Sequence, residues 1–218
     1  MDAPPAWLVA AIDEGAAAPG QALPDGADVK LAQLLLLLER WTARINLTAV
    51  RGLADMVAAH VLDSLSIRRF IAGQRIADVG TGAGFPGLPL ALVLPERAFE
   101  LLDSHGRKLA FVRQAIAALA IANARAVQAR AEAYRPERPY DTVCVRAFGS
   151  LEAIVAASGH LVAADGVLLA MKGRDPEAEL RAFGHSAAAP AWQTEVLPLS
   201  VPGLGEGARH LVRLRRAR

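Results

Sequence analysis

The first third of the chain carries the hydrophobic spacing of amphipathic helices. Leucines at positions 31, 34, 35 and 38 recur at helical intervals, and the segment from Val29 to Ile45 contains no Gly or Pro. The pattern predicts a helix there, with Asp28 as its N-cap. A second amphipathic helix is predicted from about Leu53 to Phe70, and a short helix over residues 3 to 15 precedes an Ala/Gly/Pro-rich linker at 16 to 27.

From Arg75 onward the pattern changes to short β-rich runs separated by helical stretches, which is typical of βαβ units and a mainly parallel sheet. Helices fit between the first five runs, the clearest at Leu109 to Ile121, and the last two runs are too close for a parallel crossover, so they must form an antiparallel hairpin. The seven predicted strands are Arg75 to Val79, Ala98 to Asp103, Arg125 to Ala129, Asp141 to Arg146, Val167 to Met171, Trp192 to Leu199 and His210 to Leu214.

These elements predict an α/β protein with two parts. Residues 1 to 74 would form an N-terminal helical extension, and residues 75 to 218 a doubly wound, Rossmann-like domain. Its sheet of seven mostly parallel strands would end in the antiparallel hairpin, and a ligand would bind at the carboxyl ends of the parallel strands.

Composition narrows the class of protein. At 218 residues the chain can bury a core without disulfides or a structural metal, and its single Cys144 excludes an intramolecular disulfide. The five histidines are scattered, so no metal site is expected. The first basic residue is Lys30, unlike a secretory signal, and the apolar stretch from Val79 to Pro95 contains four glycines and three prolines. We therefore expect a soluble, cytoplasmic protein with no membrane partner.

Charge is distributed unevenly although the net charge is only +2. Residues 1 to 29 contain five acids and no base, whereas residues 209 to 218 contain five arginines and no acid. The excess of Arg over Lys is explained about equally well by a GC-rich coding sequence and by a polyanionic partner. A GC-rich coding sequence does not, however, explain why the arginines cluster. Guanidinium groups bind phosphates well, so the arginine cluster indicates a polyanionic partner.

The most specific segment runs from Ile76 to Gly87, where a predicted strand enters a turn with four glycines in eight residues. Glycines allow positive φ angles and close approach of a ligand to the backbone, and the following helix offers free N–H donors. A purely structural turn needs one or two glycines and not an alternating series. The spacing Gly82-x-Gly84-x-x-Gly87 also satisfies the dinucleotide fingerprint, so the loop alone leaves NAD open.

Three further observations bear on the choice between NAD and S-adenosylmethionine (SAM). Pro86 interrupts the N–H donors that a pyrophosphate needs, and SAM has no phosphate. Asp103 ends the next strand 23 positions after Gly80, where its carboxylate can accept both ribose hydroxyls of either nucleoside. The Tyr-x-x-x-Lys set of small oxidoreductases is absent at both tyrosines. Together these observations favour SAM.

The loop and its companions resemble class I SAM-dependent methyltransferases. The segments that carry this likeness are Asp78 to Gly87, Leu102-Asp103-Ser104, Arg146-Ala147-Phe148 and Met171-Lys172-Gly173. With Arg44-Ile45-Asn46-Leu47-Thr48-Ala49 and His60-Val61-Leu62-Asp63-Ser64-Leu65, the set is similar to the RsmG (GidB) family of 16S rRNA guanine-N7 methyltransferases over about residues 30 to 175. His105 departs from the family pattern.

The resemblance implies SAM as cofactor. Asp78 could accept from its ammonium group or from N–H groups of its own loop, and Glu132 is either an acceptor for the adenine amino group or a solvated loop acid. Arg146 could hold the cofactor, an rRNA phosphate or a carboxylate across the cleft. The implied cofactor-binding residues are Gly80, Gly82, Gly84, Phe85, Asp103, Ala131, Glu132 and Arg146.

The resemblance also implies methylation of N7 of a guanine in the 530 loop of 16S rRNA, with rRNA or a small ribosomal subunit precursor as partner of a monomeric enzyme. Asn46, Thr48, His60 and Asp63 are candidates for the nucleotide pocket, or they simply cap and bridge helices. Arg213, Arg215 and Arg216 are candidates for contacting RNA phosphates.

No catalytic residue is assigned, because guanine N7 has an in-plane lone pair and no hydrogen to remove. Cys144 lies between two valines in a predicted strand, so an inert buried thiol is favoured over a nucleophile. The alternatives are a small NAD-dependent oxidoreductase and a non-catalytic ribosome assembly factor.

Overall fold

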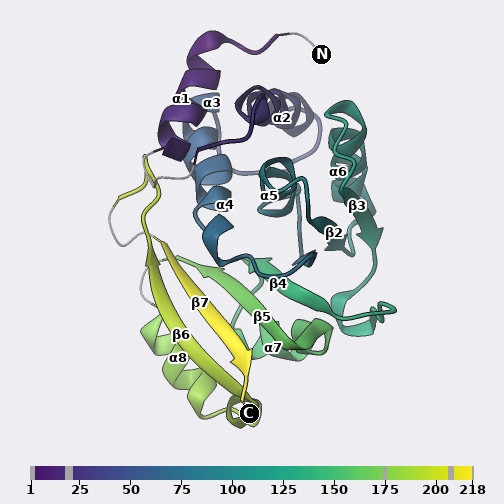
Figure 1. The fold of residues 1–218 in the computed structure, drawn as a ribbon, viewed down its shortest axis with the longest axis vertical. Coiled ribbons are helices and arrows are strands. Elements are labelled where there is room, and N and C mark those ends of the chain that lie inside the picture. The colour runs from purple at the N-terminus through teal and green to yellow at the C-terminus, as the bar shows by residue number, and fades with distance from the viewer. Residues whose placement is uncertain (1–2, 18–21, 174–175, 206–208, 218) are drawn as a thin grey trace.

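A single sheet of seven strands forms the centre of the computed structural model, which describes residues 3–17, 22–173, 176–205 and 209–217 (Figure 1). The strand order is β3-β2-β1-β4-β5-β7-β6. β1 to β5 pair in parallel, and β7 pairs antiparallel with both β5 and β6. The strands are β1 (Arg75–Val79), β2 (Ala98–Asp103), β3 (Ala124–Gln128), β4 (Tyr140–Arg146), β5 (Val162–Lys172), β6 (Trp192–Leu199) and β7 (Arg209–Arg216). All seven predicted strands and the terminal hairpin are confirmed.

Helices cover both faces of this sheet, because side chains alternate between the faces along each strand and most of them are apolar. One buried cluster joins α1, α2, the π-helix η1, α5 and α6 to one face, and the other joins α7 and α8 to the opposite face. The helices are α1 (Ala6–Ala17), α2 (Ala27–Thr42), α3 (Leu53–Met56), η1 (Val57–Leu62), α4 (Asp63–Leu65), α5 (Gly87–Val93), α6 (Gly106–Ala118), α7 (Leu151–Ser158) and α8 (Glu177–Gly184).

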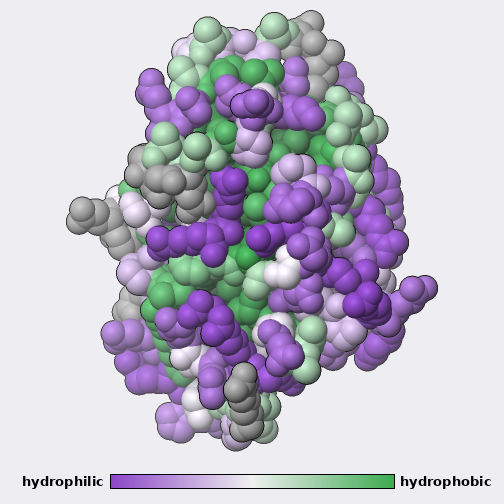
Figure 2. Space-filling view, in the orientation of Figure 1, coloured by the Kyte–Doolittle hydropathy of each residue, from purple (hydrophilic) through white to green (hydrophobic). Residues whose placement is uncertain are grey.

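The N-terminal helices pack on the first of these faces. Their leucines continue the same apolar cluster that contains Ile76 and Leu169 of the sheet. Figure 2 shows hydrophobic residues gathered along the middle of the molecule with hydrophilic side chains on both sides. The proposed division of the chain into an extension at 1–74 and a domain at 75–218 therefore separates segments that share one core.

Helix α2 begins at Ala27, two residues earlier than the predicted cap at Asp28 allows. Its N-cap is Gly26, in the left-handed conformation at φ 73°, and no side chain caps the helix. Asp28 is not the N-cap but lies in the first turn, where its charge is favourable toward the positive end of the helix dipole. Glycine takes the cap position here because it adopts a positive φ without steric cost.

The second predicted helix is present but is not a uniform α-helix. The chain is α-helical in α3 and α4, whereas the six residues of η1 between them form a π-helix. A π-helical turn inserts an extra residue and rotates the side chains that follow, and such turns are frequent at functional sites. Here it positions His60 and Asp63, both of which are buried.

The connection between β3 and β4 contains no α-helix, so the prediction of helices between all of the first five strands is wrong at this point. It contains only the 3₁₀ turn η3 (Ala131–Ala133). Pro136 and Pro139 follow within this short segment and prevent a longer helix. Side chains tie the segment to the sheet instead, because the hydroxyl groups of Tyr134 and Tyr140 both donate to Glu100 Oε2, at 2.9 and 2.6 Å.

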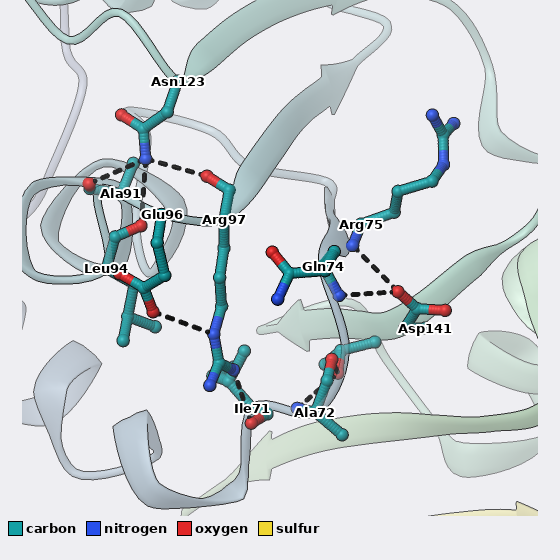
Figure 3. Close-up of polar contacts among 11 residues, drawn as sticks. Ile71, Ala72, Gln74, Arg75, Ala91, Leu94, Glu96, Arg97, Asn123 and Asp141 are labelled. Carbon is teal, nitrogen blue, oxygen red and sulfur yellow. Dashed lines mark hydrogen bonds and ion pairs between the residues drawn. The ribbon is translucent and has the colours of Figure 1, made fainter.

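Side chains also close the end of the sheet where β1 begins (Figure 3). Asn123 Nδ2 donates to three backbone carbonyl groups at the end of α5 and in the following turn, and Asp141 Oδ2 accepts from the backbone N–H groups of Gln74 and Arg75. These bonds satisfy backbone groups that no strand or helix pairs. Side-chain hydrogen bonds therefore stabilise the end of the sheet where β1 begins. The open end is the opposite one, where the parallel strands finish.

Candidate functional site

The glycine loop lies directly after β1 and depends on the absence of side chains. Gly80, Gly82 and Gly84 have φ angles of 70°, 59° and 84°, which residues with a Cβ rarely adopt. A Cβ on Gly80 would lie 2.7 Å from Cδ2 of Phe148, in the loop after β4. The bare backbone at Gly80 is thus needed both for the turn and for the approach of this ring.

Asp78, near the end of β1, holds the glycine loop in place through hydrogen bonds. Its Oδ2 accepts from the Thr81 hydroxyl at 2.6 Å and from the Gly87 N–H at 2.8 Å. The expected role in holding its own loop is therefore present. Asp78 Oδ1 is buried and has no hydrogen-bond partner in the described part of the chain. Burial, only partly offset by those two bonds, raises the Asp78 pKa to about 6.

Asp103 lies at the end of β2 and joins the loop to the next helix. Its Oδ2 accepts from the Gly82 N–H at 2.9 Å, and its Oδ1 accepts from the His105 N–H at 2.8 Å and lies 3.0 Å from Nδ1 of that ring. Burial alone would raise the Asp103 pKa, but these hydrogen bonds outweigh it and lower the pKa. The side chain is therefore a carboxylate at neutral pH, with further lone pairs available to a ligand.

A cavity of about 320 Å³ opens above these residues, and we call it the first cavity. The ends of β1, β2 and β3 and the loop after β4 surround it. It brings together four of the predicted cofactor residues, Gly80, Asp103, Ala131 and Glu132, and adds residues that sequence reasoning missed, Lys108 and Phe148 among them. Glu132 is exposed there, on the η3 turn that Tyr134 anchors.

The other predicted cofactor residues do not line this cavity. Phe85 is buried, and its ring stacks on His60 with centroids 4.9 Å apart. Gly82 and Gly84 shape the loop rather than the cavity wall. Arg146 faces a neighbouring cavity, with its guanidinium 5.7 Å from the centroid of the Phe85 ring.

That neighbouring cavity has a volume of about 530 Å³, and we call it the second cavity. Its walls come from η1, α4, α8 and the ends of β4, β5 and β7. Ala147 lines both cavities and has a φ of 53°, which is unusual for a residue other than glycine. The lining residues include Ala59, His60, Asp63, Arg146, Met171, Lys172, Glu179 and Arg209.

Asp63 connects the N-terminal helices to the sheet. It is only 2% exposed, and its two oxygens accept from Arg146 NH1 at 3.1 Å and from Arg209 Nε at 2.9 Å. Arg146 NH1 also donates to the Ala59 carbonyl. Of the three roles left open for Arg146, the structure shows the bond to a carboxylate across the cleft. The guanidinium groups of both arginines therefore lie at the wall of the second cavity.

His60 packs beside this group and bonds to a second predicted residue. Its Nε2 lies 2.9 Å from the Thr48 hydroxyl, which brings those two candidates together. Burial, followed by the nearby Arg146 charge, lowers the His60 pKa to about 4, so the ring is neutral at pH 7. Asn46 does not line the cavity, and its Oδ1 accepts from exposed Arg51 at 3.4 Å.

The C-terminal arginines lie along the last strand of the sheet. Residues 209 to 216 are strand β7, between β5 and β6. Arg213 pairs with Glu195 on β6, and Arg216 donates to the Gly159 carbonyl and packs over the Trp192 ring. β7 runs antiparallel to β5, so these arginines lie progressively farther from the second cavity, which only Arg209 reaches.

Two residues of the second cavity lacked an assigned role at the level of sequence. Lys172 belongs to the motif Met171-Lys172-Gly173, which contributes to the family resemblance but assigns no role to Lys172. Glu179 follows on α8 and shows no sequence signal. In the structure Lys172 Nζ donates to Glu179 Oε1 and to the Gly149 carbonyl, each at 2.6 Å.

The remaining groups to consider are the Cys144 thiol and the potential metal ligands. Cys144 is buried, and burial raises the pKa of its thiol, in agreement with an inert side chain. Among the described residues no cluster of His, Cys, Asp or Glu could hold a metal ion. None of the described helices combines the length and the apolarity that crossing a membrane requires.

Comparison with known proteins gives a family match across most of the chain. The model of the GidB family, described as rRNA small subunit methyltransferase G, matches residues 28–212. The ribosomal RNA small subunit methyltransferase G of Stenotrophomonas maltophilia (strain K279a) is 44% identical over 210 residues, which cover 95% of each chain. The protein of the same name from Xanthomonas campestris pv. campestris (strain B100) is 47% identical over 184 residues, 84% of each chain.

Solved structures share the fold at low sequence identity. An rRNA methylase from Streptococcus thermophilus superposes with a TM-score of 0.51 at 12% identity, over 78% of this chain and 99% of that chain. A precorrin-6y C5,15-methyltransferase from Geobacter metallireducens GS-15 superposes with a TM-score of 0.54 at 16% identity, over 79% and 92%. These likenesses confirm the fold of class I methyltransferases.

Proposed function

This chain belongs to the rRNA small subunit methyltransferase G family, and on that basis we propose that it methylates N7 of a guanine in 16S rRNA with SAM as methyl donor. The relatives are named for methylation of small subunit rRNA, which supports the substrate class. They give no support to the NAD-dependent oxidoreductase or to the non-catalytic assembly factor. Action as a monomer is part of the proposal.

The first cavity fits SAM in the chemistry of its walls. Asp103 offers a carboxylate for the ribose hydroxyls, and the backbone at Gly80 has no Cβ to exclude a ligand. The η3 turn offers Glu132 and the Ala131 peptide to the adenine ring. The buried, unpaired Asp78 Oδ1 beneath the loop is a counter-charge for a cationic ligand. The cofactor roles of these residues are part of the proposal.

When bound, SAM supplies a methyl group that leaves its sulfur as a bond forms to N7, so the positive charge passes from the sulfonium to the guanine ring. N7 carries no proton, and the protein's own residues need only hold the base in line and provide a suitable field. Neutral His60 and the Arg146–Asp63 pair form a fixed wall beside the Phe85 ring. Because N7 has no proton to remove, this target needs no general base among the lining residues.

The observation that carries the proposal is the pair of adjoining cavities that meet at Ala147, one suited to a nucleoside and the other lined by the guanidinium groups of Arg146 and Arg209. The test uses 16S rRNA from cells with and without the gene. Borohydride and aniline cleave RNA at 7-methylguanosine, and primer extension locates the break. We expect a break in the 530 loop that disappears with the gene and returns with the gene restored. A break that persists without the gene contradicts the proposal.

A further inference from the structure

Resting on the proposed function, we propose that the second cavity holds the target guanine after it leaves the RNA stack, and that Glu179 recognises its N1–H and N2 amino groups. Enzymes that modify a base take it out of the stack and bind its Watson–Crick edge in a pocket. The second cavity adjoins the first at Ala147, so a base in it lies next to the methyl donor's site. Its volume of about 530 Å³ is within the usual range for small ligands, roughly 300–1,000 Å³.

The cavity presents an unused acceptor on one side. Glu179 Oε1 is held by Lys172 at 2.6 Å, whereas Glu179 Oε2 makes no hydrogen bond to any residue that the structure describes. Lys172 is itself fixed by the Gly149 carbonyl, so the carboxylate is oriented before a ligand arrives. A preoriented acceptor costs little ordering entropy when a ligand binds.

The cavity presents unused donors as well. Arg146 uses only NH1 in its bonds to Asp63 and Ala59, and its Nε and NH2 groups make no hydrogen bond within the described residues. The buried carboxylate of Asp63 fixes the guanidinium in place. The apolar side chains of Ala59, Ala147 and Met171 also line the cavity, as suits the faces of a flat base.

This combination matches guanine and not adenine. Guanine presents O6 as an acceptor beside N1–H and the N2 amino group as donors, so it needs a cation and a carboxylate. Adenine presents the opposite arrangement, an amino donor at N6 and an acceptor at N1. Arg146 is the cation for O6 and Glu179 the carboxylate for N1–H and N2. An adenine in the same place would leave Glu179 Oε2 without a donor, which is costly in a dry site.

Glu179 also lies where charge develops. Methylation at N7 makes the guanine ring cationic and its N1–H more acidic, so the bond to the carboxylate strengthens as the reaction proceeds. An interaction that is stronger in the transition state than in the ground state raises kcat. Loss of Glu179 is therefore expected to lower kcat more than it raises KM for RNA.

The test compares guanosine with inosine at the target position of ligated, full-length 16S rRNA. Inosine keeps N7, O6 and N1–H and lacks only the N2 amino group. For the wild-type enzyme we expect kcat/KM to fall roughly tenfold to hundredfold with inosine. In Glu179→Ala we expect the guanosine rate to fall and the two substrates to become equal within a factor of two. Glu179→Gln, whose amide oxygen accepts one bond, should keep a measurable rate and an intermediate ratio.

Glu177→Ala is the matched control on the same helix, because Glu177 is outside the lining residues of the second cavity and its exposed carboxylate pairs with Arg181 at the surface. It should preserve the wild-type ratio. SAM affinity should stay unchanged in all variants, which shows that they are folded. An undiminished guanosine-to-inosine ratio in Glu179→Ala and Glu179→Gln overturns the inference. A wild-type enzyme that leaves this guanine unmethylated overturns the proposed function instead.

Discussion

Replacing Asp63 with Asn tests the link between the N-terminal helices and the site. Asp63 is 2% exposed and neutralises two arginines, so the substitution leaves both cations facing an uncharged amide. Removing one partner of a buried ion pair costs about 3–5 kcal/mol. Because Arg146 and Arg209 are 22% and 30% exposed, water can solvate them in part, and we expect the lower end, about 3 kcal/mol.

A loss of this size is easily measured. A change of 1 kcal/mol shifts Tm by about 2–4 °C in a chain of this length, so Asp63→Asn should lower Tm by about 6–12 °C. Methyl transfer to rRNA should fall more than tenfold, because Arg146 loses its fixed position. The affinity for SAM should change less than twofold, since neither arginine lines the first cavity.

Asp55→Asn is the matched control, because Asp55 lies in α3 of the same helical segment and is exposed. It should leave Tm within 2 °C of the wild type. Thermal denaturation and calorimetry on the two variants give the comparison. The reasoning is refuted if Asp63→Asn unfolds at the same temperature as Asp55→Asn, or if it loses SAM binding and methyl transfer to the same extent.

Three further predictions follow from the loop, from its buried acid and from β7. Gly80→Ala and Gly26→Ala both place a Cβ at a φ near 70°, which destabilises the fold by about 1–2 kcal/mol. Only the Cβ at position 80 meets the Phe148 ring, so calorimetry should show at least tenfold weaker SAM binding in Gly80→Ala and not in Gly26→Ala. Burial holds the Asp78 pKa at about 6, above 3.8, so the folded state keeps a proton that the unfolded state releases. The free energy of unfolding should therefore fall by an amount on the order of 3 kcal/mol from pH 4 to pH 7 relative to Asp78→Asn, and identical pH dependence in urea titrations of the two proteins would reject this. Arg215→Ala should reduce the slope of log K for rRNA binding against log salt concentration by about 1. Arg213→Ala, which breaks a pair with Glu195, should change this slope less. Equal slopes for the two variants would exclude a contact between Arg215 and an RNA phosphate.

The positions of the strands along the chain and of the glycine loop could be predicted because both depend on local pattern. Apolar runs in β1 and β2 mark buried strands, and the predicted bounds of β1, β2 and the mostly exposed β6 are confirmed. Asp103 was placed next to the loop because parallel strands end at the same edge of a sheet, and its bond to the Gly82 N–H shows that proximity.

Tertiary partners could not be predicted in the same way. The choice among three roles for Arg146 depends on Asp63, 83 positions away in sequence, and on a π-helical turn that no local spacing reveals. Glu179 gains its neighbour Lys172 only when α8 packs against the end of β5. The strand that contains the β7 arginines was predicted, because Val212 and Leu214 are apolar and are fully buried, but the pairing of Arg213 with Glu195 across the hairpin was not.

Calorimetric titration with SAM tests the central claim most directly, which is that the cavity over Gly80 and Asp103 binds this cofactor. We predict one-to-one binding to the wild-type protein and at least tenfold weaker binding to Asp103→Ala, because hydrogen bonds to a charged group contribute about 1.5–3 kcal/mol. NADH should give no heat of binding. Undiminished affinity in a folded Asp103→Ala variant, or binding of NADH in place of SAM, would contradict the account.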